Sequence, residues 1–160
     1  MTRVGCTGHQ TLSPATRRDV AAAIAAALAR HGDDELVGLS SLAEGADQLF
    51  AFAVLAAGGR LHAVIPCRDY EQSFRSETVR STYETLLHLA ASSDILAFDG
   101  PSEEAFLSAG HEVVDRCDLL LAVWDGQVAG GRGGTADVVN YAWNRGIETL
   151  VVWPPGARRA

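Results

Sequence analysis

The sequence contains no lysine, since all 13 basic residues among its 160 are arginines. P-loop nucleoside triphosphatases need a lysine that reaches the β- and γ-phosphates of the substrate, and Schiff-base chemistry needs a lysine amine. The composition therefore excludes both classes of enzyme.

Cysteine is also scarce. Cys6, Cys67 and Cys117 are widely spaced and form no Cys-x-x-Cys pair, so the sequence predicts neither a zinc cage nor a disulfide framework. We expect the three to be small buried hydrophobic residues. The five histidines are scattered. We therefore expect no metal site and no cofactor, with Mg²⁺ arriving only on the phosphates of a ligand.

Long apolar runs are absent as well. No run approaches the roughly 20 residues of a membrane-spanning helix, and the N-terminus lacks the charged-then-apolar layout of a signal peptide. These features predict a cytoplasmic protein without a membrane partner. The net charge of −7 argues against nucleic acid as a partner, because affinity for the phosphate backbone requires a basic face.

Short apolar runs alternate with helical patterns along the chain. The runs typical of strands are 3–6, 35–39, 61–65, 94–98, 118–124 and 149–153. The alternation indicates βαβ units. It predicts an α/β fold: one Rossmann-like three-layer domain over residues 1–160, with a mostly parallel sheet of about six strands and with five helices.

Helix boundaries are marked by capping residues and glycines. Ser41 to Glu44 has the pattern of a capping box, which predicts a second helix that begins there and ends at Gly58-Gly59. The helical pattern of residues 70–91 predicts a helix with a break near Ser76, and Ser102 marks the start of the next one.

The loops that follow the first two strands carry candidate ligand-binding residues. In a parallel sheet these loops share one edge, where ligands bind near the switch in strand order. The first loop offers glycines for a tight turn and side chains that form hydrogen bonds. The second offers hydroxyls at a helix N-terminus, which favours anions. The candidates are Gly5, Thr7, Gly8, His9, Ser40, Ser41 and Gly45.

Two later loops add further candidates. Asp125 either accepts hydrogen bonds from ribose hydroxyls or caps a turn with Gly126. Before the last helix, four glycines within five residues permit positive φ values and a close approach of the backbone to a ligand. The free amides at the start of that helix can then hold an anion together with Thr135. The candidates in this strongest local signal are Gly130, Gly131, Arg132, Gly133, Gly134 and Thr135.

These motifs, taken in order, resemble the SLOG superfamily of Rossmann-like nucleotide-binding domains. The stretch from Gly38 to Asp47, with Gly58-Gly59 and the apolar run that ends at Pro66, is similar to the pattern of DNA-processing protein A. The stretch from Gly130 to Thr135 resembles the Gly-Gly-x-Gly-Thr phosphate loop of the LOG phosphoribohydrolases. The resemblance covers residues 3–154.

The resemblance implies a nucleotide or a nucleotide-derived ligand, such as a nucleoside phosphate or an ADP-ribose derivative. Hydrolytic relatives carry a glutamate three residues after the loop threonine, where this chain has Val138. We therefore expect a sensor or carrier domain. The alternative is an N-glycosidase or phosphoribohydrolase acting on nucleoside monophosphates, in which Asp137 or Glu112 supplies the carboxylate. Relatives of this shape often dimerise, so a homo-oligomer is a further expectation.

Overall fold

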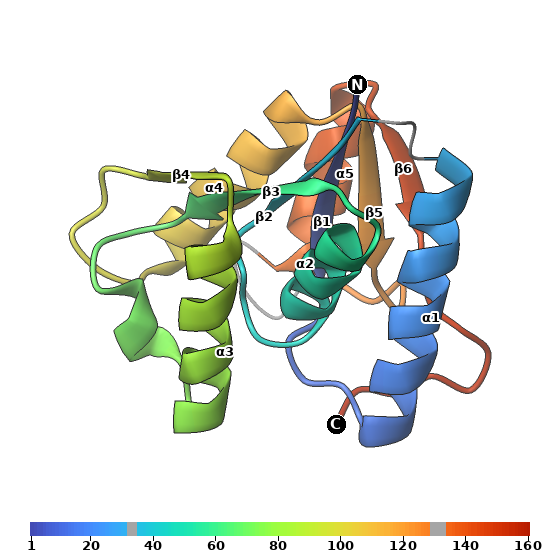
Figure 1. Ribbon diagram of the computed structural model, residues 1–160, viewed down its shortest axis with the longest axis horizontal. Helices are drawn as coiled ribbons and strands as arrows, with labels where there is room; N and C mark the ends of the chain where they lie inside the picture. Colours follow the sequence, from blue (N-terminus) through green and yellow to red (C-terminus); the bar gives the residue numbers. More distant parts are fainter. Residues whose placement is uncertain (32–34, 129–133) are drawn as a thin grey trace.

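A six-stranded sheet forms the centre of the molecule in the computed structural model, which describes residues 1–31, 35–128 and 134–160 (Figure 1). All strand pairings in these ranges are parallel, in the order β4-β3-β2-β1-β5-β6. The strands are β1 (Thr2–Gly8), β2 (Leu36–Ser40), β3 (Arg60–Ile65), β4 (Ser92–Ile95), β5 (Leu119–Val123) and β6 (Glu148–Val151). The predicted Rossmann-like α/β fold is confirmed.

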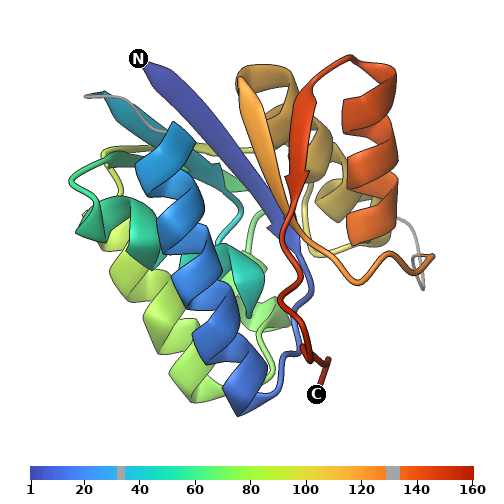
Figure 2. The same ribbon diagram turned by 90° about the vertical axis from the view of Figure 1, so that its right-hand side faces the viewer.

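Helices cover both faces of the sheet and complete three layers (Figures 1 and 2). One face carries α1 (Pro14–His31), α2 (Ala46–Ala56) and α3 (Glu77–Leu89). The other carries α4 (Glu103–Arg116) and α5 (Thr135–Asn144). A 3-10 turn, η1 (Tyr70–Ser73), precedes α3. In the described ranges, no helix is long and apolar enough to cross a membrane.

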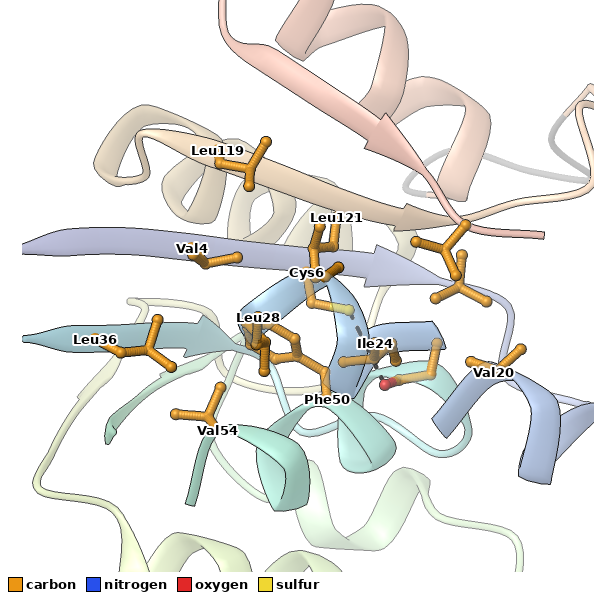
Figure 3. Close-up of a cluster of buried hydrophobic side chains, with 14 of the residues drawn as sticks. Val4, Cys6, Val20, Ile24, Leu28, Leu36, Phe50, Val54, Leu119 and Leu121 are labelled. Carbon is orange, nitrogen blue, oxygen red and sulfur yellow. Dashed lines mark hydrogen bonds between the residues drawn. The ribbon is translucent and has the colours of Figure 1, made fainter. Parts of the chain in front are cut away.

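The core follows from the alternation of side chains along each strand. Val4 and Cys6 of β1 face α1 and α2, where they pack with Ile24 and Phe50 (Figure 3). Gly5, between them, faces α4. Burying a side chain of the size of Phe50 contributes about 1.5–3 kcal/mol, so these clusters fix the sheet between its helices.

The three cysteines are buried and unpaired, as predicted. Each lies within one of the hydrophobic clusters.

Two serines start helices where the sequence predicts them. Ser76 accepts a hydrogen bond from the Val79 backbone N–H (3.1 Å) at the start of α3, which confirms the break between η1 and α3. Ser102 accepts one from the Ala105 N–H (3.0 Å) at the start of α4. Each bond satisfies an amide that has no partner within its helix.

The capping box predicted at residues 41–44 is wrong. The second helix begins only after Gly45, which has φ +85° and makes no side-chain cap bond. Leu42 has φ 57°, a left-handed conformation that a helix does not contain. The Glu44 carboxylate instead contacts the Arg75 guanidinium at 3.3 Å. A contact 31 residues away along the chain thus replaces the local bond that the spacing predicts.

The strand order reverses between β1 and β5. Strands β1 to β4 extend the sheet in one direction, and β5 and β6 extend it in the other. The helices that follow these two central strands lie on opposite faces, which opens a crevice at their carboxyl ends.

Candidate ligand-binding cleft

A cleft of about 740 Å³ lies at the carboxyl ends of β1 and β5. Its wall is built from the loops after β1, β2 and β3, from η1, from the start of α5 and from the C-terminal segment. Six of the candidates are among its lining residues: Thr7, Gly8, His9, Ser41, Gly134 and Thr135. The fold thus brings together residues that lie up to 128 positions apart in the sequence.

Four other candidates, Gly5, Ser40, Gly45 and Asp125, lie outside the cleft lining and have contacts of their own. A Cβ on Gly5 would lie 2.6 Å from Val113 Cγ1, so this glycine lets α4 approach β1. The buried Ser40 hydroxyl accepts a hydrogen bond from the Leu42 N–H (3.0 Å) and donates to the Asp47 carbonyl oxygen (3.3 Å).

Gly45 joins two loops rather than lining the cleft. A Cβ at this position would lie 2.3 Å from the Gln10 carbonyl oxygen, and its φ of +85° favours glycine as well. The loop after β2 therefore packs directly on the loop after β1. Residues 130–133 of the glycine-rich candidate loop lie outside the described residues.

His9 lines the cleft, and its side chain is only 8 % exposed. Its Nε2 accepts a hydrogen bond from the Asp125 backbone N–H (3.0 Å), and the Arg159 guanidinium also lies 3.1 Å from Nε2. Burial lowers the pKa of His9, and the charge of Arg159 lowers it further against the opposing effect of Asp125. The imidazole is therefore neutral at neutral pH.

Asp125 acts as a junction at the edge of the cleft. It accepts a hydrogen bond from the Gln127 N–H (2.9 Å), which supports the turn at Gly126. Burial alone would raise its pKa, but the Gln127 bond together with the neighbouring His9 and the Arg159 guanidinium outweighs burial and lowers that pKa. The aspartate is thus an ionised partner of Arg159, at 2.8 Å, and is not among the lining residues.

Asp47 is a lining residue that the sequence analysis does not select. Its side chain accepts a long hydrogen bond from the Ala43 N–H (3.4 Å) and lies beside the Cys6 thiol. Burial raises the pKa of Asp47 to about 7, although the Ala43 bond acts in the opposite direction. Burial also raises the pKa of Cys6, and the neighbouring Asp47 adds to that shift. The cleft therefore contains a carboxyl group that gains and loses its proton near neutral pH.

Aromatic side chains from η1 and its neighbours also line the cleft. The ring of Tyr70 meets those of Phe74 and Phe106 edge-on, at centroid distances of 5.0 and 6.2 Å. Burial holds the pKa of Tyr70 well above its usual value. Trp124 also lines the cleft and donates its indole N–H to the Gln127 carbonyl oxygen (2.8 Å). The lining thus combines aromatic and polar side chains, and Ser73 and Arg75 stand on either side of Phe74 in it.

No family model and no curated protein matches the sequence, but solved structures match the fold. DNA processing protein A from Streptococcus pneumoniae superposes with a TM-score of 0.68 at 18 % identity, covering 98 % of this chain and 52 % of that one. The same protein from Helicobacter pylori, studied for its binding of single-stranded DNA, superposes with a TM-score of 0.67 at 16 % identity. The match covers 99 % of this chain and 68 % of that one. The protein TM1055 superposes with a TM-score of 0.59 at 18 % identity, and the match covers 93 % of this chain and 72 % of that one.

The chain shares a Rossmann-like fold with these solved structures. The resemblance that the motifs indicate is thus confirmed at the level of the fold. At these identities the likeness shows the fold alone. The chain spans about half the length of the Streptococcus pneumoniae protein.

Neither candidate catalytic carboxylate is among the residues that line the cleft. Glu112 forms an ion pair with Arg116 (3.8 Å) on the exposed side of α4. Asp137 lies in the first turn of α5, but it is its neighbours Thr135, Ala136 and Val138 that line the cleft. Among the described residues, no group of three or more metal-ligating side chains is placed to hold a metal ion.

Proposed function

We propose that the cleft binds a nucleotide or a nucleotide-derived ligand, such as a nucleoside phosphate or an ADP-ribose derivative, and that the protein acts as a sensor or carrier. The observation that carries this proposal is a single cleft of about 740 Å³ whose lining combines polar and aromatic side chains. Such a volume is within the range of small-molecule sites, and a nucleotide likewise combines a charged phosphate with an aromatic base.

The start of α5 supports a binding site for the phosphate. The start of α5 lines the cleft through Gly134 and Thr135, and its N-cap carries no side-chain cap bond. The first amides of a helix lack partners within the helix, and the dipole adds a partial positive charge there. A phosphate at this position satisfies both features.

The aromatic side chains of the lining support a binding site for the base of the nucleotide. Phe74 and Phe106 present apolar surface to the cleft beside Tyr70. A planar heterocycle gains from removal of its faces from water and from edge or offset contacts with such rings.

A carrier or sensor is favoured over a hydrolase by the residues around the start of α5. Glycosidic cleavage needs a carboxylate that stabilises or traps an oxocarbenium-like centre. Val138, at the position where hydrolytic relatives carry the glutamate, lines the cleft together with Val113. A bound nucleotide therefore meets apolar side chains there, and we expect it to remain intact.

N-glycosidic hydrolysis remains a second candidate function because of Asp47. A carboxyl group with a pKa of about 7 is suited to donate a proton near neutral pH. In this scheme Asp47 gives its proton to the departing base nitrogen as the glycosidic bond breaks, and water adds its hydroxyl to the anomeric carbon. The proton of that water restores Asp47. Loss of product release in Asp47→Asn, with binding retained, is the result this candidate requires.

A thermal-shift screen with product analysis tests the proposal. The ligands are AMP, ADP, ADP-ribose, NAD, cyclic nucleotides and deoxynucleoside monophosphates, with a single-stranded DNA oligonucleotide as the competing class. A ligand at 100 times its Kd stabilises the native state by about 2.7 kcal/mol, which for a chain of this size raises Tm by roughly 5–10 °C. We expect a shift with an intact nucleotide and none with DNA, because the chain carries a net charge of −7.

A matched pair of variants locates the binding. Thr135→Val removes a hydroxyl at the start of α5, and Thr82→Val removes one from α3, outside the cleft lining. We expect the first variant to reduce the ligand-induced shift and the second to retain it. Absence of any nucleotide shift at millimolar concentration contradicts the proposal, and a shift with DNA alone replaces it with a nucleic-acid function.

A further inference from the structure

The C-terminal segment returns to the cleft after β6. Figure 2 shows residues 154–160 running past the carboxyl end of β1 toward the start of α1. The Arg158 N–H donates to Thr16 Oγ1 (2.7 Å), and the Ala160 N–H donates to the Thr11 carbonyl oxygen (3.1 Å). These bonds fix the segment on the loop after β1, beside His9.

Arg159 of this segment lines the cleft and joins His9 to Asp125. Its Nε lies 2.8 Å from Asp125 Oδ2, and its Nη2 lies 3.1 Å from both Asp125 Oδ1 and His9 Nε2. Because Asp125 balances the charge of Arg159, the pair adds little net charge to the cleft. Its main effect is to hold the imidazole ring of His9 in one position.

The hydrogen bonds around His9 determine which ring nitrogen carries the proton. The Asp125 backbone N–H points at Nε2 from 3.0 Å, and a backbone N–H cannot turn away. The Arg159 guanidinium, which has only donor atoms, lies 3.1 Å from the same nitrogen. Asp125 Oδ1 also lies 3.2 Å from Nε2, but a proton on Nε2 would meet the Asp125 backbone N–H head-on. Nε2 therefore accepts the backbone bond, and the neutral ring carries its proton on Nδ1.

The protonated nitrogen has no protein partner within the described ranges. The hydrogen bonds and ion pairs of His9 there all involve Nε2. Every buried side-chain nitrogen or oxygen of the described residues has a hydrogen-bond partner, so Nδ1 is reached by solvent. His9 is over nine-tenths buried yet lines the cleft, which makes the cleft the place where that contact occurs.

We propose that Arg159 is a positioning residue of the ligand site: together with the Asp125 amide it locks His9 in the Nδ1–H form, and Nδ1–H donates a hydrogen bond to a phosphoryl or ribose oxygen of the ligand. This inference rests on the proposed nucleotide site and extends that site to the last residues of the chain. It gives His9 a function that the imidazole could not serve in the opposite tautomer.

The tautomer is tested first, in the protein without ligand. Long-range ¹H–¹⁵N spectra distinguish a protonated Nδ1 from a protonated Nε2, and His9→Gln identifies the His9 signals by their disappearance. We expect the Nδ1–H form at pH 7.5. Arg159→Gln should lower the population of this form and raise the pH midpoint of His9, because the charge of Arg159 lowers the pKa. Arg158→Gln, whose exposed side chain lies one residue away, should change neither.

Ligand binding is tested second, by calorimetry with AMP and ADP-ribose. In His9→Gln the amide oxygen can still accept from the Asp125 N–H, but the donor at the position of Nδ1 is lost. We expect this variant to fold with a Tm close to that of the wild type and to bind roughly tenfold more weakly, as expected for one hydrogen bond. Arg159→Gln should weaken binding less, and Arg158→Gln should leave it unchanged.

The outcomes separate this inference from the proposed function. An Nε2–H form in the wild type, or equal affinities of wild type and His9→Gln, overturns the inference while the nucleotide site stands. A wild type that shows the Nδ1–H form but binds neither nucleotide contradicts the proposed function and the donor role with it. If the pH at the midpoint of the His9 titration is the same in Arg159→Gln as in the wild type, the positioning role of Arg159 is overturned.

Discussion

The molecule contains two clusters with the same three residue types, one in the cleft and one at the edge of the sheet. The cleft cluster is His9, Asp125 and Arg159. The edge cluster is His62, Asp94 and Arg116 on β3, β4 and α4. In each, a histidine Nε2 lies close to an aspartate oxygen, at 3.2 Å in the cleft and 3.0 Å at the edge.

The two clusters differ in burial and in what remains unbonded. The aspartate side chain is 17 % exposed in the cleft cluster and 54 % exposed in the edge cluster. At the edge, His62 Nδ1 already lies 2.6 Å from the Ser92 hydroxyl, so both ring nitrogens have protein partners. In the cleft, only Nε2 of His9 has a partner among the described residues. The residue types alone therefore do not make a binding site; burial and a remaining donor distinguish the cleft cluster.

The largest expected contrast concerns pH and the carboxyl groups of the two regions. Because burial raises the pKa of Asp47 in the cleft to about 7, the folded protein retains a proton that the unfolded chain releases near pH 4. This contribution to stability is lost as pH rises from about 4 to 7, by roughly 4 kcal/mol in all. Asp47→Asn should remove the loss, so that urea unfolding shows the variant gaining stability over the wild type between pH 5 and pH 8.

Asp94 at the edge provides the control for this experiment. The hydrogen bonds from Arg116 and His62 lower its pKa, so its contribution is present above about pH 4 and is lost only on further acidification. Asp94→Asn should therefore change the stability equally at pH 5 and pH 8. A wild-type pH dependence in Asp47→Asn would contradict the buried, protonated state of Asp47.

A smaller contrast is expected when each aspartate is removed at pH 7.5. Asp125→Ala leaves the Arg159 guanidinium and the Gln127 N–H without their acceptor, and we expect a loss of about 2 kcal/mol in the free energy of unfolding. Asp94→Ala breaks contacts that water replaces, and it should cost less than about 1 kcal/mol. Urea unfolding of both variants provides the comparison. Equal losses would show that the two clusters are energetically alike.

The smallest effect is expected from Ser92→Ala. This change removes the partner of His62 Nδ1 and creates at the edge the unpaired ring nitrogen found in the cleft. Because the edge is exposed to water, we expect a change in the free energy of unfolding below about 1 kcal/mol. The nucleotide-induced rise in Tm should stay at its wild-type value. A reduced rise would connect the edge cluster to ligand binding.

The fold could be predicted from the sequence because its signals are local. Apolar runs mark most of the strands, although β4 (Ser92–Ile95) begins two residues before the predicted run 94–98 and contains two serines and an aspartate. Ser76 and Ser102 mark two helix starts through bonds that span three residues. The capping box failed although it is local as well. Glu44 is held by Arg75, and the loop is bent by Leu42 and Gly45 in left-handed conformations, which its spacing could not indicate.

The candidate site was predictable only in part. Thr7 lies at the end of β1, His9 follows it and Thr135 begins α5, so the topology alone brings them to one edge of the sheet. Arg159 lies 150 residues from His9 in the chain, and no motif connects the two. Asp47 lies in the first turn of α2, but its raised pKa arises from burial by distant elements. Contacts of this kind become visible only in the folded chain.

The most direct test of a nucleotide site in the cleft is a ¹H–¹⁵N correlation titration of the whole chain with AMP and ADP-ribose. We predict that the amide signals of Thr7, His9 and Thr135 move together along one saturable curve, while those of His62, Ser92 and Asp94 stay in place. Movement confined to the edge cluster, or no movement at millimolar ligand, would contradict this account.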